Sequence, residues 1–163
     1  MNYFILLYFT VLTSAFSQTI DYNTKKGFAA EGYDVVAYFS NTAIEGSKAY
    51  STTIEGVKYK FNSQKNRDAF LKNPEAYRPQ YGGYCAYAVA TNSKKVAIDP
   101  ETFEIRDGKL YLFYNSWGTN TLTKWLEMDV KGLQKKGDLN WEAIKFNNSM
   151  KKKNWLNRPL SWL

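Results

Sequence analysis

The sequence contains no histidine and a single cysteine, Cys85. Histidine is the commonest metal ligand and a frequent general base near neutral pH, so many sites of both kinds are ruled out. A closed structural zinc site needs four ligands, usually cysteine and histidine, and is excluded by counting. One cysteine also cannot form a disulfide within the chain. Cys85 is therefore a free thiol, one half of an intermolecular bond or a metal ligand.

The sequence also lacks an apolar run long enough to cross a membrane. Its most apolar stretch, residues 4–13, has about ten residues, which suits the apolar region of a signal peptide. Ala15 and Ser17 then supply the small residues of a cleavage site. We predict a signal peptide over residues 1–17, export to the periplasm or the extracellular space, and no membrane span after signal removal. An uncleaved interfacial anchor is the alternative.

Aromatic residues and lysines are abundant. The chain has 13 Tyr, 10 Phe and 5 Trp, and their large buried areas allow a compact core within 163 residues. The formal charge of +7 would suit nucleic acid, an anionic membrane surface or an acidic partner. The lysines, however, are scattered in short groups, which is typical of solvated faces. Because export separates the protein from nucleic acid, we expect no nucleic-acid partner.

Several short segments have the patterns of β-strands. Glu55-Gly56 and Asp107-Gly108 are two-residue hairpin signals. Their predicted arms are residues 50–54 with 57–61, and residues 102–106 with 109–114. The second arm of the later hairpin is apolar on both faces, which predicts a central strand. The patterns also predict a buried strand over residues 32–39 and a short one over 96–98.

Helices are predicted on either side of the later hairpin. Ser63 can cap a helix that ends before Pro74. A second helical face runs from Leu122 to Leu133 and is predicted to close at Gly137. Asp138 would then cap a further short helix. The predicted fold class is α+β, a small antiparallel sheet of two hairpins with helices packed against it.

Five segments follow one another in an order that resembles the YHS domain family, in its exported single-domain form. They are Tyr33-Asp-Val-Val-Ala-Tyr38, Tyr59-Lys-Phe61, Asn66-Arg-Asp-Ala-Phe-Leu71, Asn73-Pro-Glu-Ala-Tyr77 and Tyr81-Gly-Gly-Tyr-Cys-Ala-Tyr87. The resemblance covers residues 28–115, the YHS-like core. Residues 116–146 are then a C-terminal helical extension, and residues 147–163 a basic and aromatic tail.

The resemblance implies a small sheet–helix unit of a kind found attached to, or beside, metal-handling proteins. Many relatives place cysteines just before the first hairpin, whereas this chain has Asp34-Val-Val-Ala37 there. Of the family's metal ligands, only the Cys85 position carries over. Its thiolate would suit a soft metal ion such as copper.

The predicted ligand site comprises Tyr33, Asp34, Tyr81, Tyr84 and Cys85. These residues combine a carboxylate, a thiol and aromatic rings with polar tips. The leading hypothesis is a non-catalytic binding module for a small ligand or metal ion. The alternative is a thiol-dependent enzyme or redox protein that uses Cys85. A third hypothesis is a protein that forms oligomers through Cys85 or the aromatic tail. A further alternative is that Cys85 is a small apolar residue of the core, because free cysteine is among the most buried residue types.

Overall fold

The computed structural model describes residues 19–146, which form an α+β fold, as predicted. Within these residues the helices are α1 (Gln64–Lys72), α2 (Pro74–Tyr77), α3 (Ala86–Asn92), α4 (Thr121–Leu126) and α5 (Val130–Ile144). The strands are β1 (Thr24–Lys25), β2 (Phe28–Ala29), β3 (Ser47–Ile54), β4 (Val57–Phe61), β5 (Asp99–Arg106), β6 (Lys109–Phe113), β7 (Asn115–Ser116) and β8 (Thr119–Asn120). None of these helices is long and apolar enough to span a bilayer.

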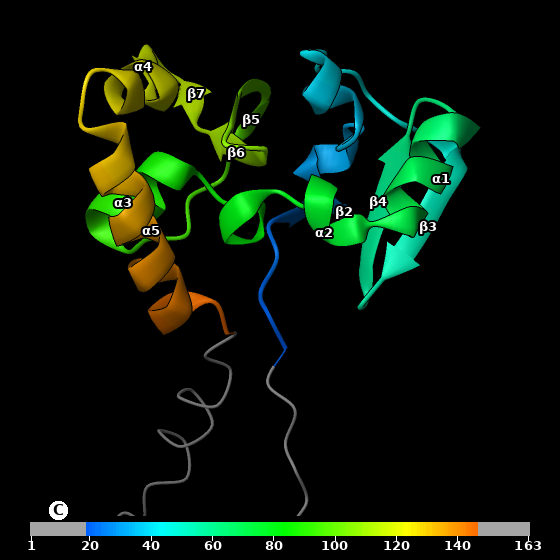
Figure 1. The fold of residues 1–163 in the computed structure, drawn as a ribbon, viewed down its shortest axis with the longest axis horizontal. Helices are drawn as coiled ribbons and strands as arrows, with labels where there is room; N and C mark the ends of the chain where they lie inside the picture. The colour runs from blue at the N-terminus through cyan, green and yellow to red at the C-terminus, as the bar shows by residue number, and fades with distance from the viewer. Residues whose placement is uncertain (1–18, 147–163) are drawn as a thin grey trace, which may run out of the picture.

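Both predicted hairpins are present, and they belong to separate sheets. β3 and β4 lie in a sheet with the strand order β1-β2-β4-β3, whereas β5 and β6 form a sheet of their own. In the larger sheet β2 runs parallel to β4, and the other neighbours are antiparallel. Figure 1 shows β3, β4 and α1 on one side of the molecule, α3, α4 and α5 on the other, and α2 between them.

The larger sheet buries one face against α1. The Phe70 ring centroid lies 4.6 Å from that of Tyr59 and 5.2 Å from that of Phe61. Lys58 and Lys60 alternate with these buried residues along β4, so they project from the opposite face. We call this opposite face the outer face of the sheet.

Four hairpin turns share the same two-residue design, in which any residue is followed by glycine and both have a positive φ. This geometry matches the right-handed twist of the strands. The turns are Lys26-Gly27, Glu55-Gly56, Asp107-Gly108 and Trp117-Gly118. The second and third confirm the sequence prediction, and the other two were not foreseen. The Trp117 side chain at its turn is almost fully exposed.

Ser63 caps α1 as predicted. Its hydroxyl accepts a hydrogen bond from the backbone N–H of Asn66 at 3.2 Å, which satisfies a donor that the helix itself leaves unpaired. α1 ends at Lys72, and Pro74 then opens α2, where its missing N–H is not needed.

The predicted buried strand over residues 32–39 is wrong. The chain there contains two 3-10 helices, Ala30–Gly32 and Ala37–Ser40. Val35 is buried as expected, but the Asp34 carboxylate accepts backbone hydrogen bonds that close a turn. A short apolar run identifies a buried segment and does not by itself specify a strand.

Residues 96–98 are not a strand either. The carbonyl of Val96 accepts one hydrogen bond from the backbone N–H of Cys85, at 3.0 Å. That contact does not extend into a ladder, and β5 begins only at Asp99.

The predicted bounds of the C-terminal helices are also wrong. α4 ends at Leu126, and Asp129 caps α5 by accepting from the backbone N–H of Gly132 at 3.1 Å. α5 then continues without a break through Gly137 and Asp138, so the first does not end a helix and the second does not cap one.

Gly137 has a packing role in place of a terminal one. A Cβ atom at this position would lie 2.4 Å from the hydroxyl oxygen of Tyr81. Because only glycine leaves room for that ring against the helix backbone, the residue is needed inside α5 despite its low helix propensity.

A second apolar cluster joins β6 to α3, α4 and α5. Its buried members are Tyr81, Ala86, Val89, Ala90, Tyr111, Phe113, Trp125 and Leu133. β6 pairs with β5 on one side and bridges to Pro79 on the other, and four of its five residues are buried. The strand is buried on both faces as predicted, but it belongs to a two-stranded sheet and so is not a central strand. Residues 116–146 thus share an apolar cluster with the segment 28–115.

The two ends of the described chain lie together. Ile20 and Phe146 form an antiparallel bridge, and the backbone N–H of Asp21 donates to the carbonyl of Lys145 at 2.7 Å. Figure 1 shows the two ends of the described chain at the same edge of the molecule. The predicted signal peptide, residues 1–17, and the predicted tail, residues 147–163, lie outside the described residues.

Candidate functional site

Asp34 is fully buried, and both oxygens of its carboxylate accept hydrogen bonds from neighbouring residues. One carboxylate oxygen accepts from the backbone N–H groups of Val36 and Ala37, at 2.9 and 3.2 Å. The other accepts from the backbone of Asn62 at 2.9 Å and from the side-chain amide of Asn66 at 2.8 Å. The carboxylate therefore anchors the turn to the end of β4 and the start of α1, and leaves no oxygen facing a ligand.

Tyr33 is partly exposed, and its hydroxyl donates to the Glu101 carboxylate at 3.1 Å. Desolvation, followed by that hydrogen bond, raises the pKa of Tyr33 above its ordinary value. Its backbone bridges to Glu45, which places the ring at the border of a large hollow.

Cys85 is fully buried. Its sulfur lies 3.3 Å from the hydroxyl oxygen of Thr121, and that hydroxyl donates its own hydrogen to the carbonyl of Tyr114 at 2.8 Å. The thiol must then be the donor in the contact with Thr121. A thiol that is enclosed and hydrogen-bonded to a neighbouring side chain is typical of a structural cysteine and not of a reactive one.

Tyr81 and Tyr84 pack against α5. The hydroxyl of Tyr81 lies 3.1 Å from an Asp138 oxygen, and burial together with that carboxylate raises its pKa. The ring centroid of Tyr84 lies 6.4 Å from the Trp141 ring, and burial together with the Asp21 carboxylate raises the pKa of Tyr84 to about 12. Both residues hold the helix in place.

The five predicted site residues do not meet in one cavity. Tyr33 lines a large hollow and Tyr81 a separate one of about 390 Å³, whereas Asp34, Tyr84 and Cys85 line neither. Across residues 19–146 there is no group of three or more Cys, Asp or Glu side chains placed to hold a metal ion. Within these residues Cys85 is therefore not part of a cluster of that kind.

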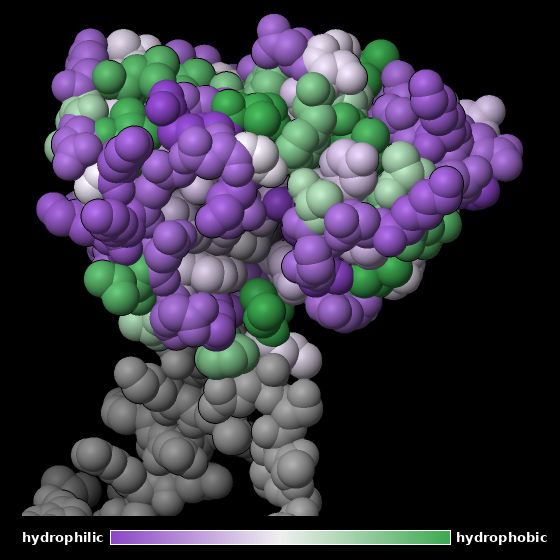
Figure 2. Space-filling model, in the orientation of Figure 1, coloured by the Kyte–Doolittle hydropathy of each residue, from purple (hydrophilic) through white to green (hydrophobic). Residues whose placement is uncertain are grey.

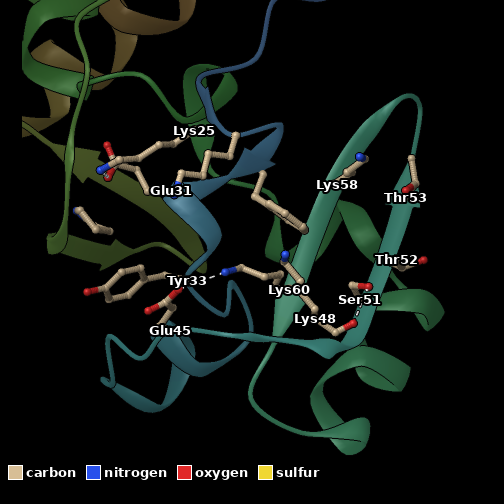
Figure 3. Close-up of a pocket in the computed structure, with 13 residues that line it drawn as sticks. Lys25, Glu31, Tyr33, Glu45, Lys48, Ser51, Thr52, Thr53, Lys58 and Lys60 are labelled. Carbon is tan, nitrogen blue, oxygen red and sulfur yellow. Dashed lines mark hydrogen bonds and ion pairs between the residues drawn. The ribbon is translucent and has the colours of Figure 1, made fainter.

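The large hollow, about 990 Å³ in volume, lies over the outer face of the larger sheet (Figure 3). We call it the lysine groove. It is lined by Lys25, Lys26, Phe28, Glu31, Tyr33, Glu45, Lys48, Ser51, Thr52, Thr53, Lys58, Lys60 and Pro100. Figure 2 shows hydrophilic side chains gathered over the part of the molecule that contains β3 and β4.

Strand register aligns the groove residues in rows. Directly paired residues point to the same face of a sheet. Lys25 pairs with Phe28, Phe28 with Lys58, and Lys58 with Thr53, so one row crosses all four strands. Ser51 pairs with Lys60 in the next row. Residues far apart in sequence thus form one continuous surface.

Lys60 reaches the groove through a slot between two glycines. A Cβ atom on Gly32 would lie 2.4 Å from Cε of Lys60, and one on Gly46 would lie 2.4 Å from the Lys60 backbone. The ammonium then pairs with Glu45 at 3.1 Å and lies 5.0 Å from the Phe28 ring centroid. Close packing fixes this lysine far more tightly than an ordinary surface lysine.

The groove carries more positive than negative charge. Lys25 pairs with Glu31, and that hydrogen bond and charge raise the pKa of Lys25. Three further lysines have no carboxylate within ion-pair distance among residues 19–146, namely Lys26, Lys48 and Lys58. Five lysines against two glutamates leave an excess of three positive charges along the lining.

Of the residues that line this groove, only Tyr33 was among the predicted site residues. The missed signal is Lys26-Gly27, which has the residue–glycine pattern of a hairpin turn and brings β1 and β2 onto the sheet. The parallel pairing of β2 with β4 is long-range and has no local signature.

Comparison of the chain with protein-family models, curated proteins and solved structures finds no match. The resemblance to the YHS domain family therefore stays a prediction.

Proposed function

We propose that the protein is an exported, non-catalytic binding module that holds an anionic ligand in the lysine groove. The observation that supports this proposal is the excess of positive charge in a hollow of about 990 Å³, with three lysines free of ion pairs among residues 19–146. An anion placed there gains Coulomb attraction without first displacing a carboxylate from those three ammonium groups.

The position of the groove adds support. Its floor is the outer face of a sheet whose other face is packed on α1, so the ligand surface is held by the core. Exposed ammonium groups remain hydrated and screened by salt, hence affinity would come from several weak contacts and fall with ionic strength.

A YHS-like core over residues 28–115 stays part of the proposal, because most of the residues that line the groove belong to that segment. The copper hypothesis and the thiol-dependent alternative both depend on Cys85, which is enclosed and hydrogen-bonded to Thr121. That geometry favours neither, so the ligand site of the proposal moves from Cys85 to the lysines.

The test is a titration of the full-length protein with three soluble polyanions: polyphosphate, polyglutamate and oligogalacturonate. We expect at least one to bind at low salt, with an affinity that falls as salt rises. The variant K26E/K48E/K58E should bind that ligand at least about tenfold more weakly.

The matched control is K65E/K135E/K136E, which makes the same change in net charge at exposed positions of α1 and α5. It should keep most of the affinity. Equal losses in both variants would show attraction to net charge alone and overturn the proposal, as would the absence of binding to all three polyanions.

A further inference from the structure

We infer that the natural ligand of the lysine groove is an acidic polysaccharide segment, a chain of sugars that carry both carboxylates and hydroxyls. This inference rests on the proposed function and narrows it from anions in general to one chemical class. It follows from the groups that accompany the lysines in the groove lining.

The lining mixes cations with neutral and negative hydrogen-bonding groups (Figure 3). Thr53 lies in the same row as Lys58, and Ser51 lies opposite Lys60. Glu31 and Glu45 are the ion-pair partners of Lys25 and Lys60. A carboxylate repels a purely anionic ligand but accepts hydrogen bonds from hydroxyl groups. A ligand that carries both anions and hydroxyls can satisfy both kinds of group.

The same lining is poorly suited to nucleic acid or polyphosphate. Glu31 and Glu45 repel the continuous negative charge of such chains, and polyphosphate has no hydroxyl hydrogen to donate to their carboxylates. Single-stranded nucleic acid binds on exposed aromatic rings. The groove lining has two aromatic rings, those of Phe28 and Tyr33, which are too few to stack a run of successive bases.

The spacing of the charges also favours a chain with intermittent charge. Neighbouring strands lie about 4.8 Å apart, so Lys25 and Lys58, two strands apart in one row, are separated by about 10 Å at their backbones. Phe28 lies between them and offers an apolar surface to the C–H face of a sugar ring. An extended ligand crossing the strands would meet charge, apolar ring, charge and hydroxyl in turn.

The experiment compares oligogalacturonate, polyglutamate and polyphosphate of equal total charge, each titrated into the full-length protein at the same salt concentration. We expect oligogalacturonate to bind most tightly, by about fivefold or more. Thr53→Val removes a hydroxyl and Glu45→Gln removes a negative charge, and both keep the side-chain shape. Each should lower the ratio of oligogalacturonate affinity to polyphosphate affinity by about threefold or more.

The outcomes separate this inference from the function on which it rests. If polyglutamate or polyphosphate binds as tightly as the sugar, or if the two substitutions leave the ratio unchanged, the sugar assignment is overturned while anion binding in the groove stands. If none of the three ligands binds, both are overturned. Circular dichroism of each variant confirms that the fold is retained.

Discussion

Asp34 shows how a single carboxylate can organise a segment that lacks regular secondary structure. Its four hydrogen bonds come from three separate places: the turn after it, the end of β4 and the first turn of α1. A buried charge is tolerated only when hydrogen bonds replace its hydration, and here they do. The residue that we predicted as a ligand group is therefore an internal brace.

Replacing this brace should be costly. Asp34→Ala takes an acceptor away from four donors, of which the Ala37 N–H and the Asn66 amide keep a second acceptor. We therefore expect a loss of about 3 kcal/mol in the free energy of unfolding, measured by urea denaturation. Asp34→Asn keeps the shape but turns an NH₂ group toward donors, and should cost about 2 kcal/mol or more. Asp68→Ala, at a partly exposed pair with Arg67, is the control and should cost less than about 1 kcal/mol. Similar values for Asp34→Ala and Asp68→Ala would contradict the bracing role.

Cys85 should behave as a core residue in a labelling experiment. Its sulfur is enclosed and donates to Thr121, so a thiol reagent must wait for the structure to open. We expect labelling of the native protein to be on the order of 10³-fold slower than labelling in denaturant. Fast labelling of the native state would show an accessible thiol and revive the redox alternative. The variant C85A should fold and should keep its affinity for the polyanion.

Among the elements, α5 depends on a glycine in its interior. The Tyr81 ring lies against Gly137, and its hydroxyl is held by Asp138 one residue further on. Glycine lowers the helix propensity of α5 at this position, but it allows a close contact between α5 and the segment between α2 and α3. This contact is the main reason why the sequence pattern misplaced the end of the helix.

The sign of the stability change caused by Gly137→Ala tests that explanation. At an ordinary interior helix position the change stabilises a protein by about 1 kcal/mol. Here we expect destabilisation of about 1–3 kcal/mol, because the new methyl group meets the Tyr81 ring. In the Tyr81→Phe background the penalty should shrink, since the nearest atom is the hydroxyl oxygen. Thermal unfolding of the four proteins of this double-mutant cycle gives the coupling, and an increase in Tm for Gly137→Ala alone would refute the packing role.

Elements with a local chemical cause could be predicted from the sequence, and those with a distant cause could not. Glu55-Gly56, Asp107-Gly108 and Ser63 act through their immediate neighbours, and each did what the sequence indicated. The turn at Asp34 depends on donors from β4 and α1, and the interior role of Gly137 depends on Tyr81. Neither partner is visible within a local window.

At the scale of the whole molecule, tyrosine is a structural residue in both apolar clusters. Tyr38 and Tyr59 lie in the apolar cluster next to the larger sheet. Tyr81 and Tyr111 lie in the apolar cluster around β6. Burial raises the pKa of each of these phenols, to about 12 for Tyr59, because the phenolate would lose its hydration. Both halves of the molecule are therefore sensitive to alkali.

This arrangement predicts alkaline unfolding with a defined sign. In the unfolded chain tyrosine ionises near pH 10, whereas the buried phenols stay protonated until higher pH. Stability is thus unaffected below pH 10 and falls between pH 10 and about 12, by about 1.4 kcal/mol per pH unit for each such tyrosine. Phenolate absorbance from the buried tyrosines should appear together with loss of circular dichroism. A tyrosine titration complete before the fold is lost would contradict the prediction.

The groove forms only when distant parts of the chain come together in the folded molecule, which explains why the sequence predicted the site elsewhere. Its lysines come from β1, β3, β4 and a turn, and the register of three strand pairs brings them together. Reasoning from the sequence favoured the stretch around Cys85 because its unusual residues are adjacent in the chain. In the structure their side chains fill the interior.

The bridge between Ile20 and Phe146 has a topological consequence. A chain whose described ends meet can be joined end to end by a short linker and opened elsewhere, giving a circular permutant with the same contacts. Glu55-Gly56 and Asp107-Gly108 are exposed turns at which to open it, and a Cβ atom on either glycine would meet no other atom. The first turn lies beside the groove, and the second is remote from it along the chain. Comparing the two permutants would show whether folding depends on the order in which the segments are synthesised.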